Sequence, residues 1–327
     1  MPPGGIAGLQ VAMAPPPEIG PDDVLVRVQA ASLNYHDLYV VRAVAPPANG
    51  LIPLSDAAGV VEAVGARVTG FAVGDHVIST FFPGSSDDAA LPPDFSGVPG
   101  DGVAGFAAEW VACPANALTR APADYSFAEA STLPCAGLTA WRALVVNGGL
   151  QKDEVVLVQG TGGVSLFALQ FAKAFGARVV AISSSDEKLE RLRAVGADHV
   201  VNYRTTPQWG EAVLALVGGA DHVIEIGGAG TLPQSIIAAR NGGHIAVIGV
   251  LAGITGEIPT VAIMRKQLRL IGLTVGSRAE QQRMVEALEA LPLRPVLDEG
   301  SFVLATLTEA FRHLESGRHF GKITVAI

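Results

Sequence analysis

Six short apolar segments recur along the second half of the chain, at residues 155–159, 178–182, 199–203, 222–226, 244–248 and 268–272. The segments 164–175, 186–195, 207–217 and 231–240 lie between them and place apolar residues at helical spacings of three and four. The short segments are continuous apolar runs rather than alternating patterns, which indicates strands buried on both faces. The alternation predicts an α/β fold with a doubly wound, six-stranded parallel sheet.

The first part of the chain has a different pattern. Before about residue 120, glycine and proline interrupt short β-rich runs such as 24–28 and 60–64, without regular strand–helix alternation. Residues 304–327 hold one helix and one closing strand, 322–325, which we expect to return to the first domain. A chain of 327 residues is too long for one ordinary core. We therefore expect a β-rich domain, residues 1–118 and 278–327, and an α/β domain that carries the parallel sheet, residues 119–277.

A glycine-rich turn joins the first apolar segment of the sheet to its helix. Glycine at its first position permits a sharp turn, and glycine at its third lets a pyrophosphate approach the backbone at the start of a helix. The third glycine of the G-x-G-x-x-G pattern is replaced by Ser165 in this chain. We expect a glycine at that position to be tolerated. The turn alone is also compatible with an ordinary strand–helix connection, but the six-strand frame favours dinucleotide binding. The predicted contacts are Gly160, Thr161, Gly162, Gly163 and Val164.

The second strand ends in small hydroxyl side chains instead of the acidic residue that binds the ribose of NAD. Ser183, Ser184 and Ser185 follow the apolar run, and Lys188 can reach a 2′-phosphate as a point charge. Tyr203, just past the third strand, is predicted to lie beside the same adenosine. Ser184 and Glu187 also match a helix-capping pattern, and both roles are compatible. We expect NADPH (NADP) as the cofactor rather than NADH.

The composition excludes several classes of partner. The formal net charge is −9, and no basic run exists, so we expect no nucleic acid. The uncharged stretch 155–172 is explained by a strand, turn and helix, so we expect no membrane span. The start of the chain lacks the basic region of a signal peptide. Cys113 and Cys135 give no disulfide framework, which suits a reducing, cytoplasmic location.

Several motifs occur together and in order: ASLNYHD at 31–37, GVVEAVG at 59–65, VGDHV at 73–77, LPCAGLTAW at 133–141, SDEK at 185–188 and GRHFGK at 317–322. With them the chain resembles the medium-chain dehydrogenase/reductase superfamily, in its quinone oxidoreductase and zeta-crystallin branch. The resemblance implies a GroES-like catalytic domain built from both chain ends, with a Rossmann domain inserted. It also implies a homodimer through the sixth Rossmann strand, 268–274.

The resemblance adds residues to the expected cofactor site. Asn34 and Thr139 match positions near the nicotinamide of the family. The remaining positions implied in this way are Gly227, Gly249, Val250, Leu251, Leu273, Val275 and Lys322.

Zinc-dependent members of the superfamily supply a cysteine, a Gly-His-Glu segment and a later cysteine or aspartate as ligands. At the first place this chain reads Asn34-Tyr35-His36-Asp37, and at the Gly-His-Glu place it reads Leu54-Ser55-Asp56-Ala57-Ala58-Gly59. The segment 82–88 stands where the structural zinc lobe would be and contains no cysteine. His36, Asp37 and Asp56 could form a sparse metal site, but polar residues that hold a loop are the favoured interpretation. We expect no bound metal.

Hydride transfer without a Lewis acid suits acceptors that spread negative charge by conjugation. The sequence therefore predicts a zinc-independent, NADPH-dependent oxidoreductase that reduces a small-molecule quinone or α,β-unsaturated carbonyl. Tyr39 matches a position near the nicotinamide of the resembling family, which makes it the candidate proton donor or carbonyl partner, or else an aromatic wall of the pocket. Asn34 and His36 are the other catalytic candidates. Two alternatives remain: a zinc-free alcohol or aldehyde dehydrogenase, and a non-catalytic NADPH-binding protein.

Overall fold

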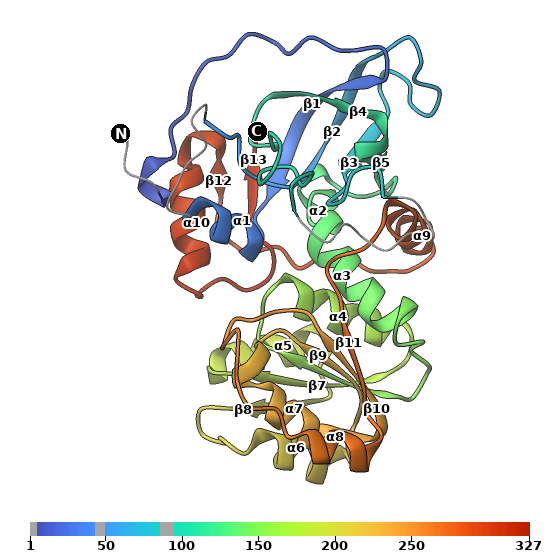
Figure 1. Cartoon of the computed structure of the whole chain (residues 1–327), viewed down its shortest axis with the longest axis vertical. Helices are drawn as coiled ribbons and strands as arrows, with labels where there is room; N and C mark the ends of the chain where they lie inside the picture. The colour runs from blue at the N-terminus through green and yellow to red at the C-terminus, as the bar shows by residue number, and fades with distance from the viewer. Residues whose placement is uncertain (1–4, 43–49, 86–94) are drawn as a thin grey trace. The chain divides into compact units, whose positions relative to one another are not determined.

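The computed structural model describes residues 5–42, 50–85 and 95–327. The chain forms two compact units: unit 1 consists of Met1–Leu138 and Val275–Ile327, and unit 2 of Thr139–Thr274. Both ends of the chain belong to unit 1 (Figure 1).

The boundary between the units differs from the expected one, because residues 119–138 belong to unit 1. The Ser32 hydroxyl donates to the carbonyl of Ser131 at 2.8 Å, and the backbone N–H of Cys135 donates to Asp56 at 3.1 Å. At the other junction, residues 275–277 also belong to unit 1. Apolar periodicity locates helices and strands, but it does not show which sheet a short connecting helix packs against.

Unit 1 is built on a mixed sheet in which β1 (Asp23–Ser32) is central. β1 pairs antiparallel with β2, β4 and β13, so the last strand of the chain lies beside the first. The closing strand occupies Thr324–Ala326, slightly later than expected. The other strands of this sheet are β2 (Asp56–Val64), β3 (His76–Ser79), β4 (Trp110–Pro114), β5 (Leu118–Arg120) and β12 (Phe302–Val303). The helices of unit 1 include α1 (Tyr35–Arg42), α2 (Phe127–Ala130), α9 (Arg278–Leu288) and α10 (Leu307–Glu315).

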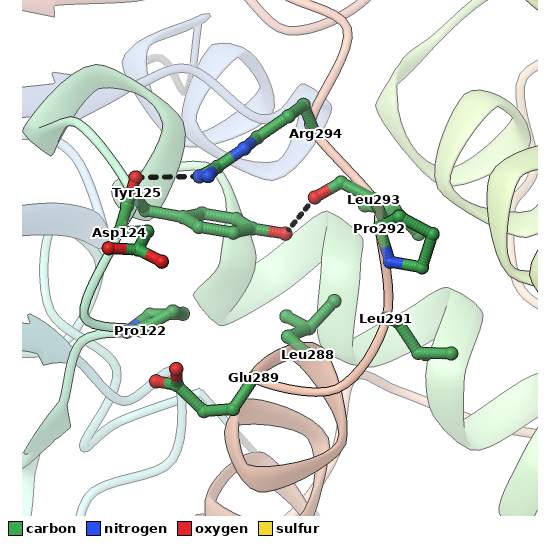
Figure 2. Close-up of a pocket in the computed structure, with 9 residues that line it drawn as sticks. All are labelled: Pro122, Asp124, Tyr125, Leu288, Glu289, Leu291, Pro292, Leu293 and Arg294. Carbon is green, nitrogen blue, oxygen red and sulfur yellow. Dashed lines mark hydrogen bonds between the residues drawn. The ribbon is translucent and has the colours of Figure 1, made fainter.

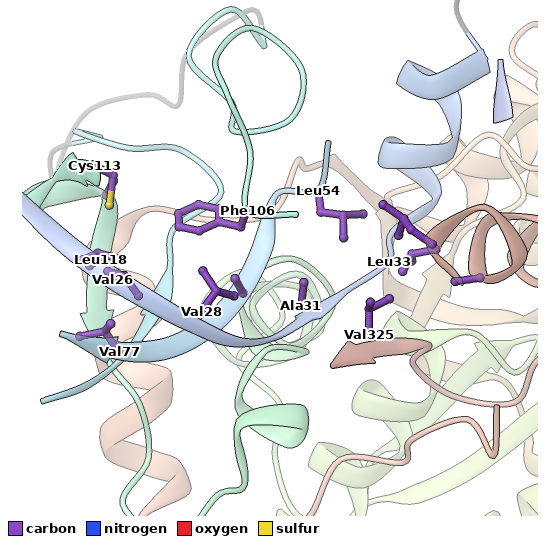
Figure 3. Close-up of a cluster of buried hydrophobic side chains, with 14 of the residues drawn as sticks. Val26, Val28, Ala31, Leu33, Leu54, Val77, Phe106, Cys113, Leu118 and Val325 are labelled. Carbon is purple, nitrogen blue, oxygen red and sulfur yellow. The ribbon is translucent and has the colours of Figure 1, made fainter. Parts of the chain in front are cut away.

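One hydrophobic cluster joins the two ends of the chain within unit 1. Val24, Val26 and Val28 of β1 are buried at alternate positions, as a strand with one face on the core requires. They pack in the same cluster as Phe106 and Val325 (Figure 3). Residues near positions 34 and 322 are therefore brought together by a shared core.

Unit 2 contains the predicted six-stranded sheet, in the order β11-β10-β9-β6-β7-β8. Every neighbouring pair is parallel, which confirms the doubly wound architecture. The strands are β6 (Val155–Gln159), β7 (Arg178–Ser183), β8 (His199–Asn202), β9 (Ala220–Glu225), β10 (Ala239–Val247) and β11 (Arg269–Gly272). The predicted helices are α4 (Gly163–Ala174), α5 (Asp186–Val195), α6 (Trp209–Val217) and α7 (Leu232–Ala238), and α8 (Thr260–Lys266) adds one that the pattern did not reveal.

The uncharged stretch 155–172 divides into β6 and most of α4, as expected. Among the described residues, no helix has both the length and the apolar character needed to cross a bilayer.

Two buried histidines lie at paired positions of β9 and β10. His222 Nδ1 is 3.3 Å from His244 Nδ1, and His222 Nε2 is 2.9 Å from Glu154 Oε2. His244 Nε2 is buried without a hydrogen-bond partner among the described residues. Burial, followed by the neighbouring His222, lowers the pKa of His244 from 6.5 to about 4.

This lowered pKa predicts acid sensitivity. Because the folded state binds the His244 proton less readily than the unfolded state, stability should fall as the pH decreases from about 6.5 towards 4. We expect His244→Gln to lose less free energy of unfolding between pH 7 and pH 5 than the wild type, measured by urea denaturation. The exposed His76→Gln variant is the control. An equal pH dependence in His244→Gln and the wild type would contradict this assignment.

Candidate functional site

The glycine turn lies where β6 ends and α4 begins. Gly160 has φ +73°, a conformation that favours glycine. Gly162 precedes the helix with φ −78° and ψ 173°, which any residue can adopt. A Cβ built on Gly162 would meet no heavy atom within 4 Å. The turn is therefore open at Gly162, beside helix N–H groups that have no intrahelical partner, and this arrangement fits a pyrophosphate.

Ser165 replaces the third glycine of the motif and has a structural role. It is fully buried, and its hydroxyl donates to the carbonyl of Gln159 at 2.5 Å. This bond ties the first turn of α4 to the end of β6. The expectation that glycine is tolerated at 165 needs correction, because Ser165→Gly loses a buried hydrogen bond in addition to helix propensity.

The carboxyl ends of the parallel strands bring the other predicted groups of unit 2 to the same edge of the sheet. The N–H of Gly160 donates to Ile182 O at 2.7 Å, and the N–H of Tyr203 donates to Ser183 O at 3.1 Å. The glycine turn, the serine segment and Tyr203 are therefore neighbours along this edge.

The serine segment begins α5, but the capping residue is Ser185 and not Ser184. The Ser185 side chain accepts from the N–H of Lys188 at 3.4 Å. Asp186 accepts from Asn202 Nδ2 at 2.7 Å, which holds its carboxylate towards the end of β8. The residues directly after β7 thus carry hydroxyl groups. The first carboxylate after them, that of Asp186, is hydrogen-bonded to Asn202 of β8.

Glu225, at the end of β9, is a central residue that the sequence analysis did not identify. It is fully buried, where β9 adjoins β6 and the strand order reverses. Its carboxylate accepts from Gln159 Nε2 at 2.9 Å, and a solitary acid inside an apolar strand was the available signal. The other donors are the N–H groups of Gly227 (2.7 Å) and Gly228 (3.0 Å) and the hydroxyls of Thr231 (2.5 Å) and Ser235.

The glycines expected in the cofactor site after β9 and β10 have packing roles of their own. A Cβ on Gly227 would collide with the side chain of Thr231, and one on Gly249 with the carbonyl of Ile226. Val250 and Leu251 are each 51% exposed and are open to a ligand. Thr139 and Leu273 are buried.

The predicted residues of unit 1 meet in a buried polar network centred on Lys322. Its ammonium donates to Asn34 Oδ1 at 2.6 Å and to the carbonyl of Leu33 at 2.7 Å. The same ammonium lies 3.9 Å from Asp56 Oδ2. Asn34 Nδ2 donates to Ser55 Oγ at 3.2 Å, so both ends of the Asn34 amide are engaged.

Two buried carboxyl groups complete this network. Asp37 accepts from the N–H groups of Asn34 at 2.7 Å and Ser55 at 3.0 Å, which fixes the start of α1. Asp56 accepts from Ser55 Oγ at 2.8 Å and from the N–H of Cys135 at 3.1 Å. Burial, with the charge of Asp56, raises the pKa of Asp37 to about 7. Burial also raises the pKa of Asp56, and Lys322 opposes that rise.

These residues do not fit a zinc ion. Asn34 and Asp56 already bind protein donors, and a buried ammonium lies beside both. His36 faces Asp101 at 3.2 Å and does not join Asp37 and Asp56 in a cluster. Within the described ranges, no three or more His, Cys, Asp or Glu side chains gather as a metal site would require.

The two remaining candidates lie on α1 and differ in their surroundings. Tyr39 is 70% exposed. The His36 side chain is 19% exposed, and its ring contacts those of Phe81 and Phe95, at centroid distances of 5.4 and 4.8 Å.

A small pocket of about 90 Å³ in unit 1 contains none of the predicted residues (Figure 2). The Tyr125 hydroxyl donates to the carbonyl of Leu293 at 2.6 Å, and Arg294 donates to the carbonyl of Asp124 at 2.7 Å. Burial raises the pKa of Tyr125 to about 12. Because these polar groups pair with each other, we assign the pocket no part in the chemistry.

Two family models match the chain. The alcohol dehydrogenase GroES-like domain matches residues 20–123, and the zinc-binding dehydrogenase model matches residues 163–290. A zinc-type alcohol dehydrogenase-like protein of Schizosaccharomyces pombe is 41% identical over 327 residues, which cover 95% of this chain and 93% of the relative.

Solved structures agree with this result. A Sinorhizobium meliloti protein described as an alcohol dehydrogenase superposes with a TM-score of 0.89 at 44% identity, covering 96% of this chain and 93% of that one. A NAD-dependent alcohol dehydrogenase gives 0.89 at 37% identity, covering 99% and 97%. Proteins similar at 27–31% identity are named for the reduction of acryloyl-CoA, quinones and 2-methylene-furan-3-one, and one structure at 27% identity holds NADP and 2-octenoyl-CoA.

The open position at Gly162 predicts a selective loss of cofactor binding. Gly162→Val places a side chain where the pyrophosphate approaches, without disturbing the fold, because its backbone angles suit valine and no protein atom is displaced. We expect near-native circular dichroism and at least about a hundredfold weaker binding of the nicotinamide cofactor by calorimetry, roughly 2.7 kcal/mol. Gly70→Val, also in open space, is the matched control. Normal affinity in a folded Gly162→Val variant would mean that the turn is only structural.

The buried network of unit 1 predicts a strong dependence of stability on Lys322. Lys322→Met leaves Asp56 buried without its counter-charge and should lower the free energy of unfolding by about 3 kcal/mol in urea denaturation. Adding Asp56→Asn should recover part of that loss, because the uncompensated charge is removed. The exposed Lys152→Met variant is the control. If the single and double variants are equally unstable, the pairing has no energetic role.

Proposed function

The chain belongs to the medium-chain dehydrogenase/reductase superfamily, and from its site we propose a zinc-independent, NADPH-dependent oxidoreductase that transfers hydride to a quinone or an α,β-unsaturated carbonyl. Membership of this superfamily supports an oxidoreductase with a nicotinamide cofactor. The acceptor, the NADPH preference and the zinc independence are the proposed parts.

The observation that carries the proposal is the Lys322 network at the positions of the zinc ligands. Its ammonium donates to Asn34 and lies 3.9 Å from Asp56, so these groups are committed to one another. Without a Lewis acid, a saturated ketone would leave a localised alkoxide, whereas a quinone or enone spreads the charge over conjugated atoms. The pairing of Lys322 with Asn34 and Asp56 therefore favours conjugated carbonyl compounds as hydride acceptors.

The chain's own residues have separable roles in this reaction. We assign the turn at Gly162 and the start of α4 to the pyrophosphate, and Ser183, Ser184, Ser185 and Lys188 to the 2′-phosphate. When bound, the nicotinamide supplies the hydride. Asn34 has both amide atoms bonded and Asp37 fixes the start of α1, so this segment is rigid before any substrate arrives.

Aromatic rings beside α1 favour a flat acceptor. Phe95 is 37% exposed, and its ring lies 6.1 Å from the stacked ring of Phe82 and 4.8 Å from His36. Aromatic faces pack well against planar conjugated molecules. This supports quinones and cyclic enones over small aliphatic aldehydes.

The second candidate function is a zinc-free alcohol or aldehyde dehydrogenase. It is favoured by the alcohol dehydrogenase names of the relatives at 37–44% identity, one of which is NAD-dependent. The third candidate is a non-catalytic NADPH-binding protein, which would bind the cofactor without turnover.

We further propose a cytoplasmic homodimer joined through β11. This strand forms an edge of its sheet, and it follows an apolar segment in which Ile254 and Met264 are 79% and 69% exposed.

The hydroxyl segment after β7 predicts a preference for NADPH. Dissociation constants for NADPH and NADH should differ by at least about tenfold, roughly 1.4 kcal/mol. Lys188→Ala should weaken NADPH far more than NADH, because it removes a charge partner of the 2′-phosphate. Lys152→Ala is the control. Equal affinities, or a preference for NADH, would refute the assignment.

The proposed reaction is tested by NADPH oxidation with a naphthoquinone, cyclohexenone and a simple aldehyde, alongside elemental analysis. We expect turnover of the first two acceptors, no stoichiometric zinc and no effect of a chelator. Chelator-sensitive turnover with one zinc per chain would overturn zinc independence. Turnover of the aldehyde alone would favour the second candidate, and binding without any turnover the third.

A further inference from the structure

Asn202 holds the first carboxylate that follows the serine segment of unit 2. It is the last residue of β8, and its Nδ2 atom donates to Asp186 Oδ1 at 2.7 Å. Asp186 is the first residue of α5 and directly follows the capping residue Ser185. The carboxylate thus belongs to the same short connection as the hydroxyl groups at the end of β7, and a residue of another strand restrains it.

The two ends of the Asn202 amide have different partners, which fixes the orientation of the side chain. Its Oδ1 atom accepts from the N–H of Arg204 at 3.0 Å, and this N–H can only donate. The Nδ2 group therefore faces the Asp186 carboxylate, which can only accept when it is ionised. The main-chain carbonyl of Asn202 also accepts from the N–H of Thr206 at 2.9 Å and from the Thr205 hydroxyl at 3.3 Å. Asn202 is therefore anchored in the turn that follows β8.

The strand order shows to which side the Asp186 carboxylate is held. β7 lies between β6, which leads into the glycine turn, and β8, which forms an edge of the sheet (Figure 1). Ser183 and Asn202 are paired residues of β7 and β8. The bond from Asn202 therefore draws the carboxylate towards β8 and away from the strand that carries the glycine turn.

A carboxylate in this connection has opposite effects on the two nicotinamide cofactors, which differ only in the 2′-phosphate. A carboxylate that reaches the ribose accepts hydrogen bonds from its hydroxyls and favours NADH. The same carboxylate repels the 2′-phosphate of NADPH, because both groups are negatively charged. The position of the Asp186 side chain therefore matters for cofactor choice, and Asn202 controls that position.

Glu187 is the other acid in the first turn of α5 and allows an internal comparison. Both acidic side chains are exposed, but the bond from Asn202 goes to Asp186. Consecutive side chains of a helix differ in direction by about 100° around its axis. A Glu187 variant therefore removes a nearby charge and leaves the bond between Asn202 and Asp186 in place.

We propose that Asn202 determines the choice between NADPH and NADH by holding the Asp186 carboxylate away from the 2′ position of the cofactor's adenosine. Asn202 is thus a positioning residue for cofactor specificity that acts through Asp186. This inference rests on the proposed assignment of the serine segment to the 2′-phosphate. Loss of the Asn202 amide releases the carboxylate, which then repels the phosphate of NADPH and accepts from the ribose hydroxyls of NADH.

The dissociation constants of NADPH and NADH are measured by calorimetry in the wild type, Asn202→Ala, Asp186→Ala and the double variant. We expect Asn202→Ala to shift the ratio of the two constants about tenfold towards NADH. In the Asp186→Ala background the same substitution should change the ratio by less than about twofold, because no carboxylate remains to be released. In the Glu187→Ala background it should keep its full effect. Asn241→Ala, at an exposed asparagine of β10, is the matched control and should leave the ratio unchanged.

Two results of this cycle would overturn the proposal. An unchanged ratio in Asn202→Ala means that the bond to Asp186 does not control specificity. A shift of the same size in the Asp186→Ala background means that Asn202 acts through the turn at 203–206 and not through the acid. Circular dichroism of each variant verifies that the fold is retained.

A comparison of 2′,5′-ADP with 5′-AMP separates this inference from the proposed function, because these ligands differ only in the 2′-phosphate and undergo no hydride transfer. Asn202→Ala should weaken 2′,5′-ADP about tenfold without weakening 5′-AMP. If the wild type turns over no acceptor or binds both cofactors equally, the proposed function fails, and the two fragments still decide the role of Asn202. Equal weakening of both fragments, or of neither, would contradict it.

Discussion

The hydrogen bonds of the buried Lys322 ammonium are the interactions that organise the polar network of unit 1. The ammonium comes from the last residues of the chain and donates to Leu33 O and Asn34 Oδ1, close to the end of the first strand. The pairing of β13 with β1 and the shared hydrophobic cluster bring these segments together. A buried cation requires compensation, and Asp56 at 3.9 Å provides it. The charge of Lys322 thus offsets part of the acidic charge buried in this network.

Glu225 has a comparable role in unit 2, with the opposite charge. Its carboxylate takes five donors from the end of β6, the turn after β9 and the start of α7. These elements flank the point where the strand order reverses, so a single buried acid holds the loops beside the glycine turn. The Ser165 hydroxyl ties α4 to the end of β6. The edge of the sheet is therefore organised by hydrogen bonds within the protein, which leaves the surface at Gly162 open for an anion.

Local pattern was sufficient wherever one segment carried the whole signal. The six strands of unit 2 and four of its helices were predictable because buried parallel strands are continuous apolar runs and helices repeat every 3.6 residues. α8 was missed because Thr260–Lys266 spans only two turns and its partly apolar surface shows no clear periodicity against one core. The unit boundary was displaced because residues 119–138 contact β1 and β2 through individual hydrogen bonds, which leave no periodic trace in the sequence.

The sequence by itself determined the parallel sheet, its glycine turn and the absence of the usual zinc-ligand residues, since each depends on residue types at short spacing. Only the tertiary structure decided which polar groups meet: Lys322 with Asn34 and Asp56, Glu225 with Gln159, and His36 with Asp101. These partners lie far apart along the chain, and their pairing depends on strand register, loop geometry and the burial that makes an unpaired charge costly. A contact of this kind has no local signature, because its energy exists only once the core has formed around it.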